Sequence, residues 1–80
     1  MQKFTVMETF AQNTSSLLKK RGITTQQLAD MIGMDRSDLS KIIRGVRGCT
    51  LDTAVSISKA LNVPISLLVD DFSEILSAAS

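Results

Sequence analysis

The first quarter of the chain carries its apolar residues at helical spacing. Between residues 6 and 21 they recur at steps of three and four, which places their side chains along one side of an α-helix. Gly22 follows directly, and a glycine readily adopts the left-handed backbone that ends many helices. The expected buried stripe consists of Met7, Phe10, Ala11, Thr14, Leu17 and Leu18.

The next segment, residues 24–45, reads as two short helices joined by a turn. Thr24 is a helix-capping residue, and Gln27 stands three positions later, where its side chain completes a capping box. Asp35 is expected to cap the second of these helices, which ends at Gly45. The side chains expected to face the core are Leu28, Ala29, Met31, Ile32, Leu39, Ile42 and Ile43.

The pattern after this segment predicts two further helices. Thr50 caps a helix over residues 51 to about 61, and Asn62 ends it. The only proline, Pro64, begins a short fifth helix. The fourth helix would bury Leu51, Ala54, Val55, Ile57, Ser58 and Leu61. The sequence therefore predicts one all-α domain over residues 1–80.

Composition narrows the classes of function. Of the 80 residues, 44% are hydrophobic and 21% are charged, which suits a folded domain. Histidine is absent and Cys49 is the only cysteine, so the usual zinc ligands and the commonest general base are missing. We expect no enzyme activity, no metal, no cofactor and no small-molecule ligand. Without a bilayer-length apolar run or a signal peptide, the sequence predicts a cytoplasmic protein with no membrane partner.

Charge is unevenly distributed, although the formal net charge is only +1. All nine Lys and Arg residues lie within residues 1–69 with five of the eight acidic residues, whereas residues 70–80 hold three acids and no base. The second helix of the motif and the loop after it, residues 36–47, contain four basic residues and one acidic residue, Asp38. The basic residues are Arg36, Lys41, Arg44 and Arg47. This arrangement predicts a surface that attracts an anionic partner.

A helix-turn-helix offers a mechanism for binding such a partner. In this motif the first helix crosses the DNA backbone, and the N-terminal part of the second points at base edges in the major groove of double-stranded DNA. If Leu39 and Ile42 hold the second helix on the core, its polar side faces outward. Arg36 and Lys41 can then donate hydrogen bonds to guanine, and Ser37 can pair with either kind of base.

Residues 23–69 resemble, without a gap, the Cro and phage-repressor type of helix-turn-helix family, also described as lambda-repressor-like or XRE. The resemblance implies a compact five-helix lambda-repressor-like domain and a regulator of transcription that binds specific DNA sequences, in particular a short repressor of the phage or prophage type. The elements that carry it are LA at 28–29, G at 33, S-L-S-K-I spread over 37–42, RG at 44–45, TLDT at 50–53 and KALNV at 59–63.

The resemblance also implies which residues touch DNA. Thr25 stands where the family usually has a glutamine that braces a phosphate, with two glutamines directly behind it. The base-reading places fall in the second motif helix, and phosphate-binding places fall at its end, in the next loop and at the start of the fourth helix. The full set is Thr25, Gln26, Gln27, Arg36, Ser37, Asp38, Ser40, Lys41, Arg44, Arg47 and Thr50.

One motif covers few base pairs, so we expect a homodimer on a palindromic operator. The tail, residues 64–80, would supply the dimer interface through Ile65, Leu68, Phe72, Ile75 and Leu76. Alternatively, Phe72 and Leu76 fold back over the first helix and complete the core. The leading alternative function is that of an antitoxin or anti-regulator subunit that works mainly through protein–protein contacts.

Overall fold

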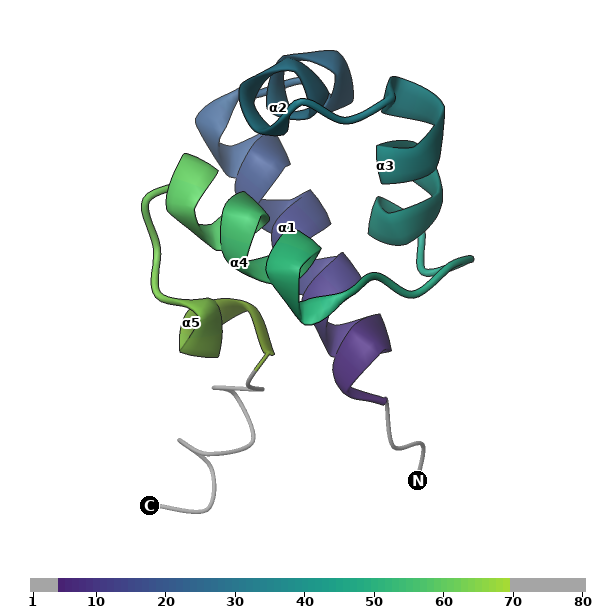
Figure 1. The fold of residues 1–80 in the computed structure, drawn as a ribbon. Coiled ribbons are helices and arrows are strands. Elements are labelled where there is room, and N and C mark those ends of the chain that lie inside the picture. The colour runs from purple at the N-terminus through teal and green to yellow at the C-terminus, as the bar shows by residue number, and fades with distance from the viewer. Residues whose placement is uncertain (1–4, 70–80) are drawn as a thin grey trace.

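The computed structural model describes residues 5–69, which form five helices and no β-strand (Figure 1). The all-α prediction is confirmed over this range. The predicted first helix has the observed bounds, and the fourth ends one residue earlier than expected because Leu61 is its C-terminal cap. The helices are α1 (Val6–Arg21), α2 (Thr25–Ile32), α3 (Arg36–Ile43), α4 (Leu51–Ala60) and α5 (Ile65–Val69).

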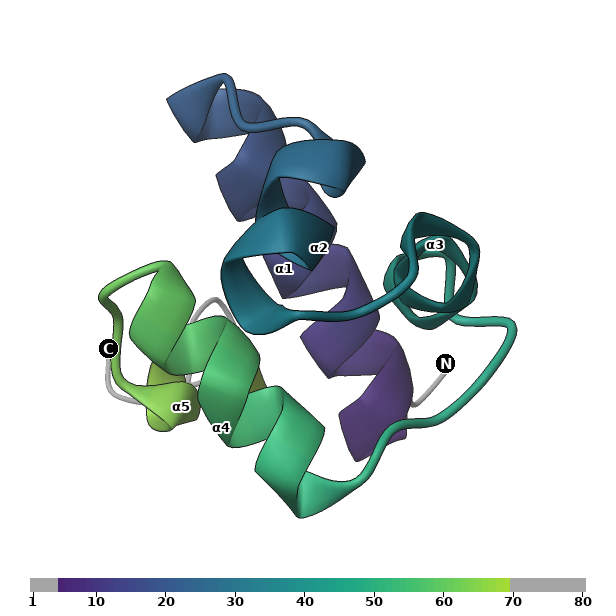
Figure 2. The ribbon, with the colours of Figure 1, turned by 45° about the horizontal axis from the view of Figure 1, so that its top comes forward.

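Helix α1 forms the centre of the arrangement. It packs against α3 and α5, while α2 packs against α3 and α4, and α4 packs against α5. In Figures 1 and 2, α3 lies on one side of α1, and α4 and α5 lie on the other. Helix α3 therefore packs mainly against α1 and α2, and the exposed residues Arg36, Ser37 and Lys41 leave one side of it open to solvent.

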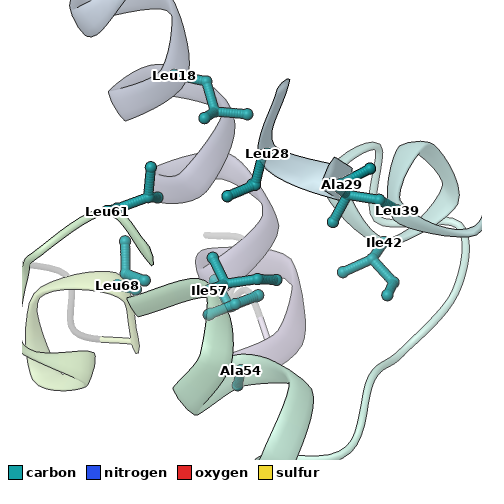
Figure 3. Packing of buried hydrophobic residues seen from close by; sticks show 10 residues of the cluster. Leu18, Leu28, Ala29, Leu39, Ile42, Ala54, Ile57, Leu61 and Leu68 are labelled. Carbon is teal, nitrogen blue, oxygen red and sulfur yellow. The ribbon is translucent and has the colours of Figure 1, made fainter. Parts of the chain in front are cut away.

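All five helices contribute to one hydrophobic core (Figure 3). Burial of apolar area is the main favourable term for a chain of this size. Most of the side chains predicted to be buried in α1, α2 and α3 are found there. The buried apolar side chains are Phe10, Ala11, Leu18, Leu28, Ala29, Leu39, Ile42, Ala54, Ile57, Leu61 and Leu68.

The helix ends follow the predicted capping residues in most cases. The N–H of Thr24 donates to Gln27 Oε1 over 2.8 Å, and the N–H of Gln27 donates to Thr24 Oγ1 over 3.0 Å, which completes the predicted capping box. Thr50 Oγ1 accepts from the N–H of Thr53 over 3.2 Å at the start of α4. Asn62 has a φ of 57° just after α4, which agrees with its predicted role in ending that helix.

Two contacts between distant residues tie the ends of α4 and α5 to α1. The guanidinium of Arg21 donates to the carbonyl of Leu61, the C-terminal cap of α4. Asn13 Nδ2 donates to the carbonyls of Leu68 and Leu67 over 2.9 and 3.3 Å, at the last turn of α5. A donor placed there satisfies carbonyls that the end of a helix leaves without a partner.

Several expectations about single side chains are wrong. Leu51 is 73% exposed, because it is the first residue of α4 and projects beyond the core. Met31 is 55% exposed, because it points away from the side of α2 that carries Leu28 and Ala29. Asp35 occupies the cap position of α3, but its side chain accepts no capping hydrogen bond. Leu68, expected at a dimer interface, is 1% exposed because it packs into the core.

Of the other residues of the predicted dimer interface, only Ile65 lies within the part of the chain that the structure describes. Ile65 is half-buried at the start of α5, and its neighbour Leu67 is the exposed apolar residue of this helix. Phe72, Ile75 and Leu76 lie outside the described residues. The choice between a dimerisation tail and a tail that completes the core therefore stays a prediction.

Candidate nucleic-acid interface

The turn between α2 and α3 sets the angle of the two motif helices. Gly33 has a φ of 69°, a left-handed conformation that a side chain would disfavour, and it ends α2. The N–H of Met34 donates to the carbonyl of Ala29 over 2.9 Å, which closes the turn. Ala29 is itself fully buried and lies beside Leu39 of α3 (Figure 3). A small side chain therefore stands where the two helices approach each other.

Helix α3 presents a polar side to solvent. Leu39 and Ile42 are buried and fix which side faces the core. At 3.6 residues per turn, the opposite side carries Ser37, Lys41 and Arg44, and all three are exposed. The structure thus brings together the central residues that the sequence assigned to DNA.

Two further candidate residues lie on the flanks of α3. Arg36 is exposed at the first position of the helix, and Ser40 is half-buried near its middle. The guanidinium Nε of Arg44 donates to the carbonyl of Ser40 over 3.4 Å, so the side chain of Arg44 lies back along the helix. This surface carries cationic and hydroxyl groups that suit phosphates and base edges.

Two of the three candidate residues of α2 have side-chain hydrogen bonds to neighbours in the sequence. Gln27 supplies the side-chain oxygen of the capping box. Gln26 Nε2 donates to Asp30 Oδ1 over 2.9 Å. Thr25 is half-buried at the first position of α2. Contact of Gln26 with DNA would therefore compete with its hydrogen bond to Asp30.

The loop after α3 folds back on the end of that helix. The N–H groups of Val46 and Arg47 both donate to the carbonyl of Lys41, over 3.0 and 3.3 Å. This loop leads to Thr50, which is exposed at the N-terminus of α4. The loop and the positive end of α4 form one border of the candidate interface.

Sequence reasoning missed an ion pair within this interface. Arg47 Nη1 lies 3.0 Å from Asp38 Oδ1, and the two side chains are 50% and 40% exposed. The residues stand nine positions apart, so their meeting depends on the path of the loop and not on helical spacing. Both were predicted to contact DNA, but their contact with each other was not foreseen.

Among the described residues there is no support for a reactive thiol, a metal site or a membrane-spanning helix. Partial burial raises the pKa of the Cys49 thiol, which disfavours the reactive thiolate. Within residues 5–69 no three His, Cys, Asp or Glu side chains gather where they could hold a metal ion. None of the helices over the same range has the length and apolar character needed to cross a bilayer.

Comparison with known proteins identifies the motif. The profile of a family described as Helix-turn-helix matches residues 15–68, which includes α2, α3 and α4 in full. The chain belongs to this helix-turn-helix family. The resemblance to Cro and phage repressors is thereby confirmed at the level of the family.

The relatives of this helix-turn-helix protein are regulators. Control protein C.SmaI of Serratia marcescens is 30% identical over 64 residues, which are 80% of this chain and 76% of the relative. The restriction-modification controller protein C.AhdI of Aeromonas hydrophila is 27% identical, with a TM-score of 0.72 over 79% of this chain and 94% of that structure.

Two more distant structures share the fold. A hypothetical transcription factor, NHTF from Neisseria, superposes with a TM-score of 0.82 over 92% of this chain and 85% of its own, at 23% identity. The clp gene regulator ClgR of C. glutamicum superposes with a TM-score of 0.77 over 98% of this chain and 97% of its own, at 18% identity. The chain is accordingly a DNA-binding helix-turn-helix transcriptional regulator, and the family is one of regulators and not of enzymes.

Proposed function

We propose that this regulator binds a palindromic site in double-stranded DNA as a homodimer and controls transcription from that site, as a short repressor does. The observation that carries the proposal is the outward side of α3, where Ser37, Lys41 and Arg44 are exposed while Leu39 and Ile42 hold the helix on the core. A helix fixed in this way can enter the major groove. A homodimer would present two such helices to two half-sites.

The position of each side chain suggests its role. Arg36, Ser37 and Lys41 would read base edges, because they belong to the exposed part of α3 that enters the groove. Arg44, at the end of α3, would contact phosphate. Thr50 would do the same, because the N-terminus of α4 attracts anions. The remaining predicted contacts are Thr25, Gln26 and Gln27 of α2, Asp38 and Ser40 of α3, and Arg47 of the loop after α3.

The regulated system is proposed from the names of the relatives. C.SmaI is named a control protein, and C.AhdI is named a restriction-modification controller protein. The matches cover 76% of C.SmaI and 94% of the C.AhdI structure. These names favour control of a restriction-modification system over a phage or prophage repressor as the setting in which the protein acts.

The proposal is tested by selecting binding sites from random DNA duplexes. A homodimer with two recognition helices should enrich a palindrome whose half-sites lie one helical turn apart, about 34 Å. Enrichment of a palindrome upstream of restriction-modification genes would support the proposed setting. If no duplex is enriched, the proposal fails, and the alternative of an antitoxin or anti-regulator subunit gains support.

Single substitutions then separate the proposed roles. We expect Arg36→Ala and Lys41→Ala each to weaken binding of the selected site by about 1 to 3 kcal/mol with little effect on unrelated duplexes. Arg44→Ala should weaken all duplexes alike and flatten the salt dependence by about one unit of slope. Titrations at several salt concentrations measure both quantities. Sequence-selective loss for Arg44→Ala would show that the roles are exchanged.

A further inference from the structure

The side chain of Arg47 lies near the start of α3, although Arg47 follows the end of that helix in the sequence. It belongs to the loop after α3, where the sequence predicts a phosphate contact. Its backbone N–H is bonded to the carbonyl of Lys41, near the end of the helix. Its guanidinium, however, lies 3.0 Å from the carboxylate of Asp38, which is the third residue of α3. The side chain therefore runs back along α3 towards its first turn.

This direction matters because the two ends of α3 meet different parts of DNA. Asp38 and Arg44 are separated by six residues, or about 9 Å along the helix axis. In a helix-turn-helix the N-terminal part of the second helix faces base edges. The ion pair thus holds the charge of Arg47 beside the end of α3 that also carries Arg36 and Ser37.

The chemistry of the pair leaves Arg47 able to bind DNA. An arginine has five N–H donors in a rigid planar fork, and Asp38 takes up one of them at Nη1. The Arg47 side chain is 50% exposed, which leaves room for its other donors to reach a ligand. The Asp38 carboxylate alone would be repelled by phosphate. Its ion pair with Arg47 offsets that charge, which explains how an acidic residue can be accommodated at a DNA-binding surface.

We propose that Asp38 positions Arg47 to read a guanine in the major groove. Arg47 is then a base-reading residue and not a phosphate contact, and Asp38 is a positioning residue that acts through it. A fixed guanidinium can donate two parallel hydrogen bonds to O6 and N7 of guanine, the commonest specific contact between protein and DNA. This inference rests on the proposed function, since it concerns how the same surface selects its site.

The first test compares two substitutions of Arg47 on the selected palindrome and on an unrelated duplex. Arg47→Ala should weaken binding of the palindrome about fivefold to a hundredfold and leave the unrelated duplex almost unaffected. Arg47→Lys keeps the charge but lacks the planar fork, so it should lose nearly as much. Both variants should relax the preference for guanine at one position of each half-site. Uniform weakening by Arg47→Ala, with full rescue by Arg47→Lys, would assign a phosphate contact and overturn the proposal.

The second test uses the sign of the effect at Asp38. Removing a negative charge near DNA strengthens binding on electrostatic grounds alone, so a purely electrostatic role predicts tighter binding by Asp38→Ala. Positioning predicts the opposite, a severalfold loss at the palindrome. The matched control is Asp35→Ala, which removes the same charge next to α3 from a side chain without a capping hydrogen bond and should bind equally or more tightly.

A double substitution isolates the coupling between the two residues. In the Arg47→Ala background, Asp38→Ala should cause no further loss, because the residue that Asp38 positions is gone. An additive loss, or tighter binding by Asp38→Ala alone, would overturn the proposal. Exposed ion pairs contribute little to stability, so all variants should keep the circular dichroism spectrum and melting temperature of the parent.

The outcomes separate this inference from the proposed function. If the parent protein selects a palindrome but the substitutions at Arg47 and Asp38 act alike on every duplex, base reading by Arg47 and its positioning by Asp38 are both wrong, and the proposed function stands. If the parent protein selects no duplex at all, the proposed function fails, and the inference that rests on it fails as well.

Discussion

Thr14 places a hydroxyl group in the middle of the core. Its side chain is fully buried, and its Oγ1 has no hydrogen-bond partner among the described residues. Removing a hydroxyl from water without replacing its hydrogen bonds is costly, and the cost falls entirely on the folded state. Valine has almost the same shape and lacks the polar atom. Thr14 is therefore a residue at which the natural sequence does not have its most stable choice.

We expect Thr14→Val to raise the free energy of unfolding by about 1 kcal/mol. For a domain of this size the melting temperature would rise by roughly 4 to 8 °C. The matched control is Thr24→Val, which loses the hydroxyl that caps α2 and should lower stability by about 1 kcal/mol. Thermal unfolding followed by circular dichroism measures both. A loss of stability for Thr14→Val would indicate a buried water bound to the hydroxyl.

Ala29 gives the opposite case, a residue whose small size is needed. It is fully buried beside Leu39 where α2 and α3 approach. We expect Ala29→Leu to destabilise the fold by about 1 to 3 kcal/mol and to weaken DNA binding, because the added volume pushes α3 outward. Met31→Leu on the exposed side of the same helix should change neither quantity. Unchanged melting temperature and DNA affinity for Ala29→Leu would show that the approach of α2 and α3 tolerates a larger residue.

At the scale of helices, the sequence correctly predicted the features that depend on neighbouring residues, such as helix caps and the apolar stripe of α1. The capping box of Thr24 and Gln27 and the cap at Thr50 need only neighbours within three residues, and both were predicted correctly. The same applies to the apolar stripe of α1. Leu51 fits the apolar spacing of α4 but is exposed, because spacing does not reveal where the core stops.

Contacts between distant residues were beyond such reasoning. The bond from Arg21 to Leu61 joins residues 40 positions apart, and it depends on the fold bringing the Leu61 carbonyl within reach of the Arg21 side chain at the end of α1. The pair of Asp38 and Arg47 likewise depends on how the loop after α3 turns back. The sequence therefore indicated which residues line the candidate interface, but not which of them hold one another in place.

Helix α5 is short enough to depend on such a distant contact. Five residues form little more than one turn, which is unstable in isolation. Two of its last carbonyls accept hydrogen bonds from Asn13 Nδ2, and the fully buried Leu68 adds apolar contact. Asn13 thus gives α5 a polar contact with α1, and Leu68 gives it an apolar contact with the core.

We expect Asn13→Ala to lower the free energy of unfolding by about 1 kcal/mol, with faster amide hydrogen exchange concentrated in α5. Asn13→Asp should be more damaging, because a carboxylate would face two carbonyl oxygens at the negative end of the helix. Hydrogen exchange resolved by residue, together with thermal unfolding, tests the ranking. If Asn13→Asp is as stable as Asn13→Ala, the bonds to the α5 carbonyls do not hold that helix.

For the whole molecule, size and site length argue for a pair of protomers. One helix-turn-helix unit reads too few base pairs to be both tight and selective, whereas two units across a two-fold axis read a palindrome. Leu68 is buried in the core, so its side chain is not available for contact with a second protomer. It leaves Ile65 half-buried and Leu67 37% exposed on α5. A larger apolar contact next to α5 would need the apolar residues that follow Val69 in the sequence, Phe72, Ile75 and Leu76.

That segment can be tested by shortening the chain after Asp71, which removes Phe72, Ile75 and Leu76. If these residues join two protomers, the shortened chain keeps its helical circular dichroism but sediments as a monomer, and it loses affinity for palindromic DNA far more than for half-sites. A chain that ends at Ser77 keeps the three apolar residues and should stay dimeric. Should the chain that ends at Asp71 unfold, the tail completes the core instead, and should it remain dimeric, the protomers meet through another surface.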